Sequence, residues 1–169
     1  MQLSANAAEK IISDMGMGDM PLIEMQPIPS PVTSDWFVQY KKLCHEFLLS
    51  LTDSVDTLAF MNFSQDEFMG LITGQSVPEN LSIRFRKPLV WGGKLEIDNL
   101  FMCWTFPHSY NLDRFIANQF GNTTIWMPNP AKKIYLPAHT AEGGDGGNAT
   151  EDRLTENSAA QIVAAGRDI

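Results

Sequence analysis

Apolar and polar residues follow two different periods along this chain, and the change comes near Leu81. Before that residue, apolar side chains recur at every third or fourth position, as they do on the buried face of a helix. The strongest pattern of this kind predicts a helix over residues 34–55. Its apolar stripe consists of Phe37, Tyr40, Cys44, Phe47 and Leu51.

Three shorter helices are predicted from weaker patterns with clearer ends. Residues 5–14 are one candidate. Ser64 and Glu67 have the spacing of a capping box, so a second helix should begin after Ser64 and end at Gly74. A third helix, closed by Gly121, is indicated by the helical spacing of Leu112, Phe115, Ile116 and Phe120.

From Leu81 onward, branched and aromatic residues separated by turn signals predict β-strands. The four stretches are residues 81–89, 94–106, 123–128 and 132–137, and residues 57–61 are a further short candidate. This order of elements predicts an α+β domain. We expect a mainly antiparallel sheet of about four strands, with the helices packed on one face.

The first two of these strands are predicted to form a hairpin. Gly92 and Gly93 suit the two central positions of a tight turn, and such a turn fixes the strand register. A slip of one residue would move every apolar side chain to the opposite face. The predicted core face has four pairs: Leu81 with Trp104, Ile83 with Met102, Phe85 with Leu100, and Lys87 with Asp98.

The other face of the hairpin is the first candidate binding surface. In the same register Arg84 lies opposite Phe101, and Arg86 lies opposite Asn99. Alternation with a core face predicts that this side of the hairpin is half-solvated. Arginine and aromatic residues are enriched where proteins bind one another, so Arg84, Arg86 and Phe101 are predicted to contact a partner.

The chain divides into an arm and a domain. Residues 1–32 are rich in methionine and proline. Residues 33–169 are predicted to form a single α+β domain, with a flexible glycine-rich loop near residues 141–149 and a C-terminal helix. Because methionine adapts to many surfaces, the arm either packs on its own domain or offers Met15, Met17 and Met20 to a partner.

Charge and hydropathy narrow the function classes. The formal net charge of -8 disfavours binding to nucleic acid or anionic membrane and favours a basic partner. No apolar run reaches the roughly 18 residues needed to span a bilayer, so we expect a cytoplasmic protein, with export by a non-classical route left open.

Four asparagines begin N-x-Ser/Thr triplets, which are either glycosylation acceptors or ordinary turn residues. They are Asn62, Asn80, Asn122 and Asn148.

The two cysteines give little indication of catalysis. Cys44 and Cys103 form neither a disulfide framework nor a zinc site, and no ligand spacing predicts a metal or another cofactor. Cys44 and His45 are neighbours on the predicted helix, so their side chains point about 100° apart. A core thiol beside a surface histidine is therefore the better interpretation.

A histidine cluster is the alternative catalytic site. His108 and His139 lie at the ends of predicted strands, where folding can bring them together. Asp98 and Asp113 belong to the same half of the chain and could supply a carboxylate. These four residues are the candidates for a hydrolase-type site around His108.

The glycine-rich loop resembles a phosphate-binding loop only in part. Four glycines within residues 143–147 precede a predicted helix. The loop lacks the lysine followed by Ser or Thr, and its Asp145 would repel phosphate. A hinge is the better interpretation, and a weak cation site formed by Asp145 and Glu151 is the alternative.

Taken together, these features predict a non-enzymatic protein-binding module, such as a cytosolic adaptor, a chaperone-like carrier or an inhibitor. It would use the arm methionines and the arginine and aromatic sheet face. Two alternatives stay open: a small hydrolase with its site around His108, and a structural subunit of a larger assembly, marked by self-association. No class of small-molecule ligand is predicted.

Overall fold

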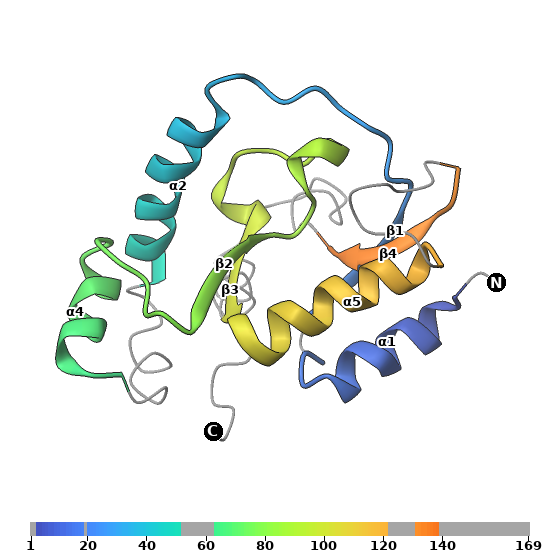
Figure 1. The fold of residues 1–169 in the computed structure, drawn as a ribbon, viewed down its shortest axis with the longest axis horizontal. Helices are drawn as coiled ribbons and strands as arrows, with labels where there is room; N and C mark the ends of the chain where they lie inside the picture. The colour runs from blue at the N-terminus through green and yellow to red at the C-terminus, as the bar shows by residue number, and fades with distance from the viewer. Residues whose placement is uncertain (1–2, 19, 52–62, 122–130, 139–169) are drawn as a thin grey trace, which may run out of the picture.

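The computed structural model of the chain describes residues 3–18, 20–51, 63–121 and 131–138 (Figure 1). Within these ranges the helices are α1 (Ala5–Asp14), α2 (Trp36–Ser50), α4 (Gln65–Ile72) and α5 (Tyr110–Gln119). The strands are β1 (Leu22–Met25), β2 (Leu81–Phe85), β3 (Leu100–Trp104) and β4 (Ile134–Pro137). All four strands pair antiparallel, so the predicted α+β class is confirmed.

Several predictions fall on residues outside those ranges. They concern the strands at 57–61 and 123–128, the glycine-rich loop and the C-terminal helix. His139, Asn62, Asn122 and Asn148 also lie outside the described residues.

The described helices end where their capping residues stand. Ser64 Oγ accepts a hydrogen bond from the Glu67 N–H at 3.2 Å, and Glu67 Oε1 accepts one from the Ser64 N–H at 3.0 Å. This capping box satisfies two N–H groups at the start of α4, as predicted. Gly74 and Gly121, with φ of 72° and 78°, follow α4 and α5 in the left-handed conformation that favours glycine.

None of the described helices is long and apolar enough to cross a bilayer.

The four strands form two separate pairs. The β2–β3 register matches the prediction from Leu81 opposite Trp104 to Phe85 opposite Leu100. In the second pair, β4 lies beside β1, a strand within residues 1–32 that the sequence pattern did not predict. Segments far apart in sequence therefore meet in a small ribbon (Figure 1).

The predicted tight turn between β2 and β3 is wrong, although the register is right. Gly92 closes a short 3-10 turn at Leu89–Trp91 with φ of 92°, and a second such turn covers Ile97–Asn99. The buried Asn99 holds this longer connection in place: its side-chain amide donates to Lys87 O at 2.9 Å and to Lys94 O at 3.0 Å. Asn99 Oδ1 accepts from the Lys87 N–H at 2.9 Å. The Asn99 side chain thus satisfies backbone N–H and C=O groups that would pair with other backbone groups in a tight turn.

Strand β3 is buried on both faces. Leu100, Met102 and Trp104 belong to one hydrophobic cluster, which also includes residues of α2 and α4. Phe101 and Cys103 belong to a second cluster, with residues of α1, α5 and β4. Figure 1 shows the β2–β3 pair between these two groups of elements. Helices therefore pack on both faces of this pair.

Helix α5 is fixed to β4 by a side chain that imitates a strand. Gln119 Oε1 accepts from the Tyr135 N–H at 2.7 Å, and Gln119 Nε2 donates to Tyr135 O at 2.9 Å. Both atoms are buried, which strengthens the two bonds and makes their loss costly. The position of α5 relative to the β1–β4 ribbon is set in this way.

Candidate functional site

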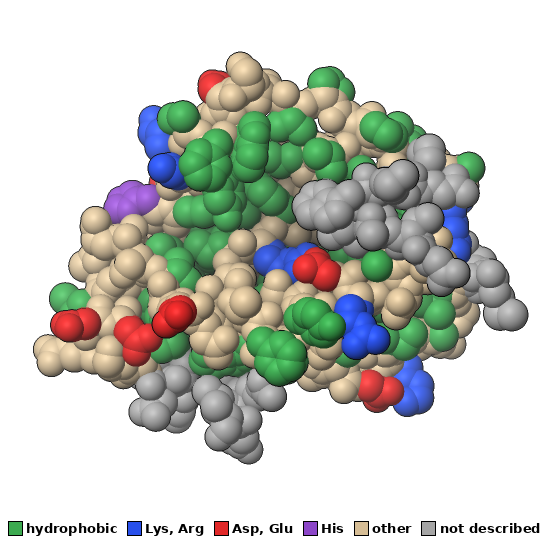
Figure 2. All heavy atoms as spheres, viewed as in Figure 1, with side chains coloured by type: hydrophobic (Ala, Val, Ile, Leu, Met, Phe, Trp, Pro, Cys, Tyr) green, Lys and Arg blue, Asp and Glu red, His purple; other side chains and the backbone are tan. Residues whose placement is uncertain are grey.

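An apolar groove with a volume of about 660 Å³ runs along β2. It is lined by residues 82–85 of β2, residues 88–91 of the connection, Val32 and Trp36 near the start of α2, and Ser109 and Asp113 near the start of α5. Figure 2 shows hydrophobic side chains gathered on this face, between α2 and the connection that follows β2. Four consecutive β2 residues line the groove although their side chains alternate between two faces. The groove therefore follows the edge of the strand.

The start of α2 supplies an exposed aromatic rim. Trp36, Phe37 and Val38 are 36%, 51% and 64% exposed, and the rings of Trp36 and Phe37 meet edge to face with centroids 5.5 Å apart. The buried residues of α2 lie in its C-terminal half, so the predicted stripe is right for Phe47 and wrong for Phe37. Contiguous exposed apolar surface of this kind often marks a binding site.

Backbone hydrogen bonds show which way the edge of β2 faces. The Arg86 N–H donates to Asn99 O at 2.7 Å and the Thr105 N–H to Asn80 O at 2.9 Å, so the even-numbered residues of β2 bond to β3. The N–H and C=O groups of Ile83 therefore point away from β3. In agreement, Ile83 O accepts a long hydrogen bond of 3.4 Å from the Tyr40 hydroxyl. Within the described part of the chain, no strand pairs with this edge.

A single ion pair closes one end of the groove. Arg84 Nη2 lies 2.7 Å from Asp113 Oδ1, and Arg84 Nη1 donates to both O and Oγ of Ser109 at 2.8 Å. The Arg84 side chain is 19% exposed and the Asp113 side chain 48% exposed. The charge presented to solvent at this end is therefore mainly the carboxylate of Asp113.

Of the three predicted sheet residues, only Arg84 reaches this groove. Arg86 is 1% exposed and Phe101 is 0% exposed, so the expectation of a half-solvated face is wrong for both. The physical reason is that the cluster containing α1, α5 and β4 covers this side of β3. The Arg86 guanidinium lies 5.5 Å from the centre of the Phe101 ring. Burial lowers the pKa of Arg86 to about 10, and the charge of Asp98 opposes that shift.

The methionines of the arm are placed mainly inside the protein. Met17 and Met20 are 1% and 4% exposed and pack in one cluster with Ala8 and Ile12 of α1. Their side chains therefore do not form the exposed partner-binding surface that was predicted. Met15 is half-buried and lies in a second cavity, away from the groove.

The predicted histidine and carboxylate candidates have separate surroundings. His108 is 2% exposed, and a Cβ added at Gly16 would lie 3.1 Å from its Nε2, which places the imidazole against the turn after α1. Asp113 is bonded to Arg84, and Asp98 acts on buried Arg86. Among the described residues, no group of three or more His, Cys, Asp or Glu side chains could hold a metal ion.

Cys44 and His45 point to different neighbours, in agreement with the sequence interpretation. His45 Nδ1 lies 2.7 Å from Gly74 O, a hydrogen bond that joins α2 to the end of α4. Cys44 is half-buried beside Tyr40, and burial raises the pKa of its thiol. The pair therefore lacks the arrangement of a nucleophile and its base.

Comparisons with protein-family models, with curated proteins and with solved structures found no match for this chain. The assignment of a function therefore rests on the groove itself. Its features are an apolar lining, exposed aromatic residues at one wall, a carboxylate at one end, and a strand edge with backbone groups directed outward.

Proposed function

We propose that the protein is a non-enzymatic binding module that holds an extended, apolar segment of a basic partner protein against the edge of β2. The observation that carries this proposal is the coincidence of a strand edge with an apolar groove. Addition of a strand to such an edge is a common way to bind a peptide, because main-chain hydrogen bonds hold any sequence and side pockets select among sequences.

The alternation of side chains along β2 suggests how the groove would select the sequence of the bound segment. Successive side chains of an added strand point to opposite faces. One set would meet Phe85 and Trp36, where aromatic surface favours an apolar residue. The other set would pass the Arg84 and Asp113 end of the groove.

Charge favours a basic segment for that second set. The more exposed member of the ion pair is Asp113, and the whole chain carries a net charge of -8. A lysine or arginine on the partner would thus be attracted at long range and at contact. Because the groove is short, we expect a small interface of the transient kind, below about 1,200 Å² in total.

Two synthetic peptides test this proposal. Each has ten residues that alternate valine and threonine, with one central arginine in the first peptide and glutamate in the second. Binding is measured by fluorescence anisotropy. We expect the arginine peptide to bind the wild-type protein, and the glutamate peptide to bind about tenfold more weakly or not at all, as one lost charge pair implies.

Three variants place the interaction. Ile83→Pro removes an N–H that points away from β3, and Trp36→Ala removes aromatic surface from the groove wall, so both should weaken binding. Leu49→Ala is the matched control, because Leu49 is 40% exposed near the other end of the same helix and does not line the groove. Binding that survives both Ile83→Pro and Trp36→Ala would contradict the proposal, as would equal binding of the two peptides.

Light scattering on the protein alone separates this proposal from its main rival. A dimer of this chain that dissociates in Ile83→Pro would show that a second copy occupies the edge. That result would favour the structural-subunit alternative and would overturn the assignment of a foreign basic partner.

A further inference from the structure

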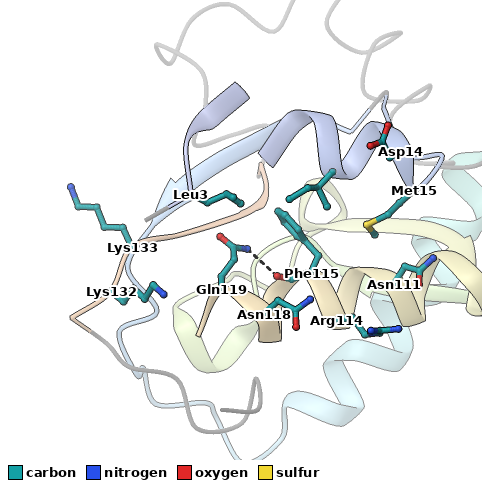
Figure 3. Close-up of a pocket in the computed structure, with 11 residues that line it drawn as sticks. Leu3, Asp14, Met15, Asn111, Arg114, Phe115, Asn118, Gln119, Lys132 and Lys133 are labelled. Atoms are coloured by element: carbon teal, nitrogen blue, oxygen red, sulfur yellow. Dashed lines mark hydrogen bonds between the residues drawn. The ribbon is translucent and has the colours of Figure 1, made fainter. Parts of the chain in front are cut away.

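A second cavity, with a volume of about 350 Å³, lies between α1 and α5 near the start of β4 (Figure 3). Its apolar surface comes from Ile11 of α1, Met15 directly after α1, Phe115 of α5, and Leu3. It is separate from the β2 groove. Asp113 faces the groove, whereas residues 111, 114, 115 and 118 line this cavity from the other side of α5, as their helical spacing requires.

The rim of this cavity is positively charged in an acidic protein. Arg114, Lys132 and Lys133 line it, against one carboxylate, Asp14. Asp14 is already 2.9 Å from the ammonium group of Lys10. Lys133 lies 4.0 Å from Glu24. For Arg114 and Lys132, the described residues include no carboxylate within ion-pair distance.

Hydrogen-bond donors are available along α5. Asn111 and Asn118 are seven positions apart and so lie on the same side of the helix, at the cavity. Over the described ranges, neither side chain takes part in a hydrogen bond. The third amide at the cavity, Gln119, is engaged with Tyr135 and with Phe115 O. Asn118 and Asn111 therefore remain to orient a ligand.

The geometry points to a binding site for a small amphiphilic anion, with its head group near Lys132 and Asn118 and its short aliphatic part against Phe115 and Ile11. An anionic head complements the cations and amide donors, and the apolar part complements the wall between α1 and α5. Half-buried Lys132 interacts more strongly with such a head than a fully exposed lysine would. The volume lies at the lower end of the range for ligand sites, which indicates a small molecule. The head group is a carboxylate or a phosphate, since the same N–H donors can bind either anion.

Four probes test the site by isothermal titration calorimetry on the full chain: octanoate, octyl phosphate, octanol and inorganic phosphate. We expect at least one of the two amphiphilic anions to bind, and the tighter of them identifies the head group. Octanol and inorganic phosphate should each bind roughly tenfold or more weakly, because each lacks one of the two complementary parts. Octanol that binds as tightly as octanoate would reduce the site to an apolar crevice and would overturn the proposal.

Variants then locate the head group. Lys132→Gln and Arg114→Gln together should weaken binding of the preferred anion by about tenfold or more, the loss expected for charge-assisted hydrogen bonds. Lys41→Gln is the matched control, since Lys41 is an exposed lysine of α2 beside Phe37 and outside the cavity. Unchanged binding in the double variant would overturn the proposal, as would the absence of binding by both amphiphilic anions.

Discussion

Arg84 of β2 and Asp113 of α5 meet at 2.7 Å across 29 positions of sequence, and the same guanidinium also holds Ser109. One arginine thereby connects a strand, the segment before a helix and the first turn of that helix. The Arg84 side chain is 19% exposed, so water screens these contacts less than it screens a surface ion pair.

Substitution of Arg84 should separate the contribution of its charge to stability from the contribution of its hydrogen-bond geometry. Arg84→Lys keeps the charge but loses the planar fork that reaches Ser109 and Asp113 together, so we expect a loss of about 1–2 kcal/mol in the free energy of unfolding. Asp113→Asn should cost less, about 0.5–1 kcal/mol, because Asp113 is nearly half exposed. Urea unfolding measures both. A lysine variant as stable as the wild type would show that charge alone is sufficient.

The side chain of Asn99 allows a test that depends on pH. Asn99→Asp replaces the amino group that donates to the carbonyls of Lys87 and Lys94 with a carboxylate oxygen that faces both of them. Burial should raise the pKa of this introduced aspartate, so the variant loses stability as pH rises through the usual aspartate pKa near 4. We expect a deficit of roughly 2–4 kcal/mol at pH 7 and a smaller one at pH 3.5.

The control for this test is Asn118→Asp, at an exposed position of α5. Its stability relative to the wild type should change little between the two pH values. Urea midpoints at pH 3.5 and 7 provide the measurement. A constant deficit for Asn99→Asp would mean that the buried amide does not bear the contacts described.

Two glycines should respond differently to alanine. A Cβ at Gly93 would lie 2.8 Å from the carbonyl carbon of Lys87 and 2.9 Å from Asn99 Nδ2, in the most constrained part of the connection. Because backbone must then move, we expect Gly93→Ala to cost about 3 kcal/mol or more. Gly121 has φ of 78° and no atom within 4 Å of an added Cβ, so Gly121→Ala should cost only about 1 kcal/mol. Thermal melts that rank these variants in the reverse order would contradict the packing around Lys87.

Because the thiol of Cys103 is buried, we expect the protein to lose stability at high pH. Burial raises the pKa of its thiol from 9.0 to about 12, with Arg84 opposing the shift and Asp113 adding to it. In the unfolded chain the thiol loses its proton near pH 9, whereas the folded protein retains it, so this residue destabilises the fold as pH rises from 9 toward 12. The stability advantage of the wild type over Cys103→Ala should therefore shrink between pH 8 and pH 10. An advantage that stays constant would show that the thiol is less buried than its 0% exposure implies.

The sequence predicted those features that depend on neighbouring residues or on strict alternation. The capping box at Ser64 and the closing glycines are local signals, and they were found in place. The β2–β3 register followed from alternating apolar pairs, since only one register puts them on a single face. The register prediction was right although the turn prediction was wrong, because the pairing of six apolar residues outweighs the preference of two glycines for a tight turn.

What the sequence did not predict depends on distant packing. Arg86 and Phe101 were placed on a half-solvated face because the alternation of β2 does not indicate that α5 covers them. One signal was present: residues 100–104 are apolar without interruption, as is typical of a strand buried on both faces. β1 was missed because four residues between prolines carry little pattern, and their partner β4 is remote in sequence. The groove was missed for the same reason, since four segments of the chain line it.

The amide of Gln119 has a consequence for how this protein behaves when concentrated. By occupying the N–H and C=O of Tyr135, it closes the side of β4 that faces away from β1. Exposed strand edges act as templates for further chains, and natural proteins block them to avoid fibril growth. At Tyr135 the ribbon is therefore sealed by a helix, whereas the edge of β2 has no strand neighbour among the described residues. Replacement of Gln119 by leucine should create a second adhesive edge, so that fibrils detected by thioflavin fluorescence form sooner than in the wild type.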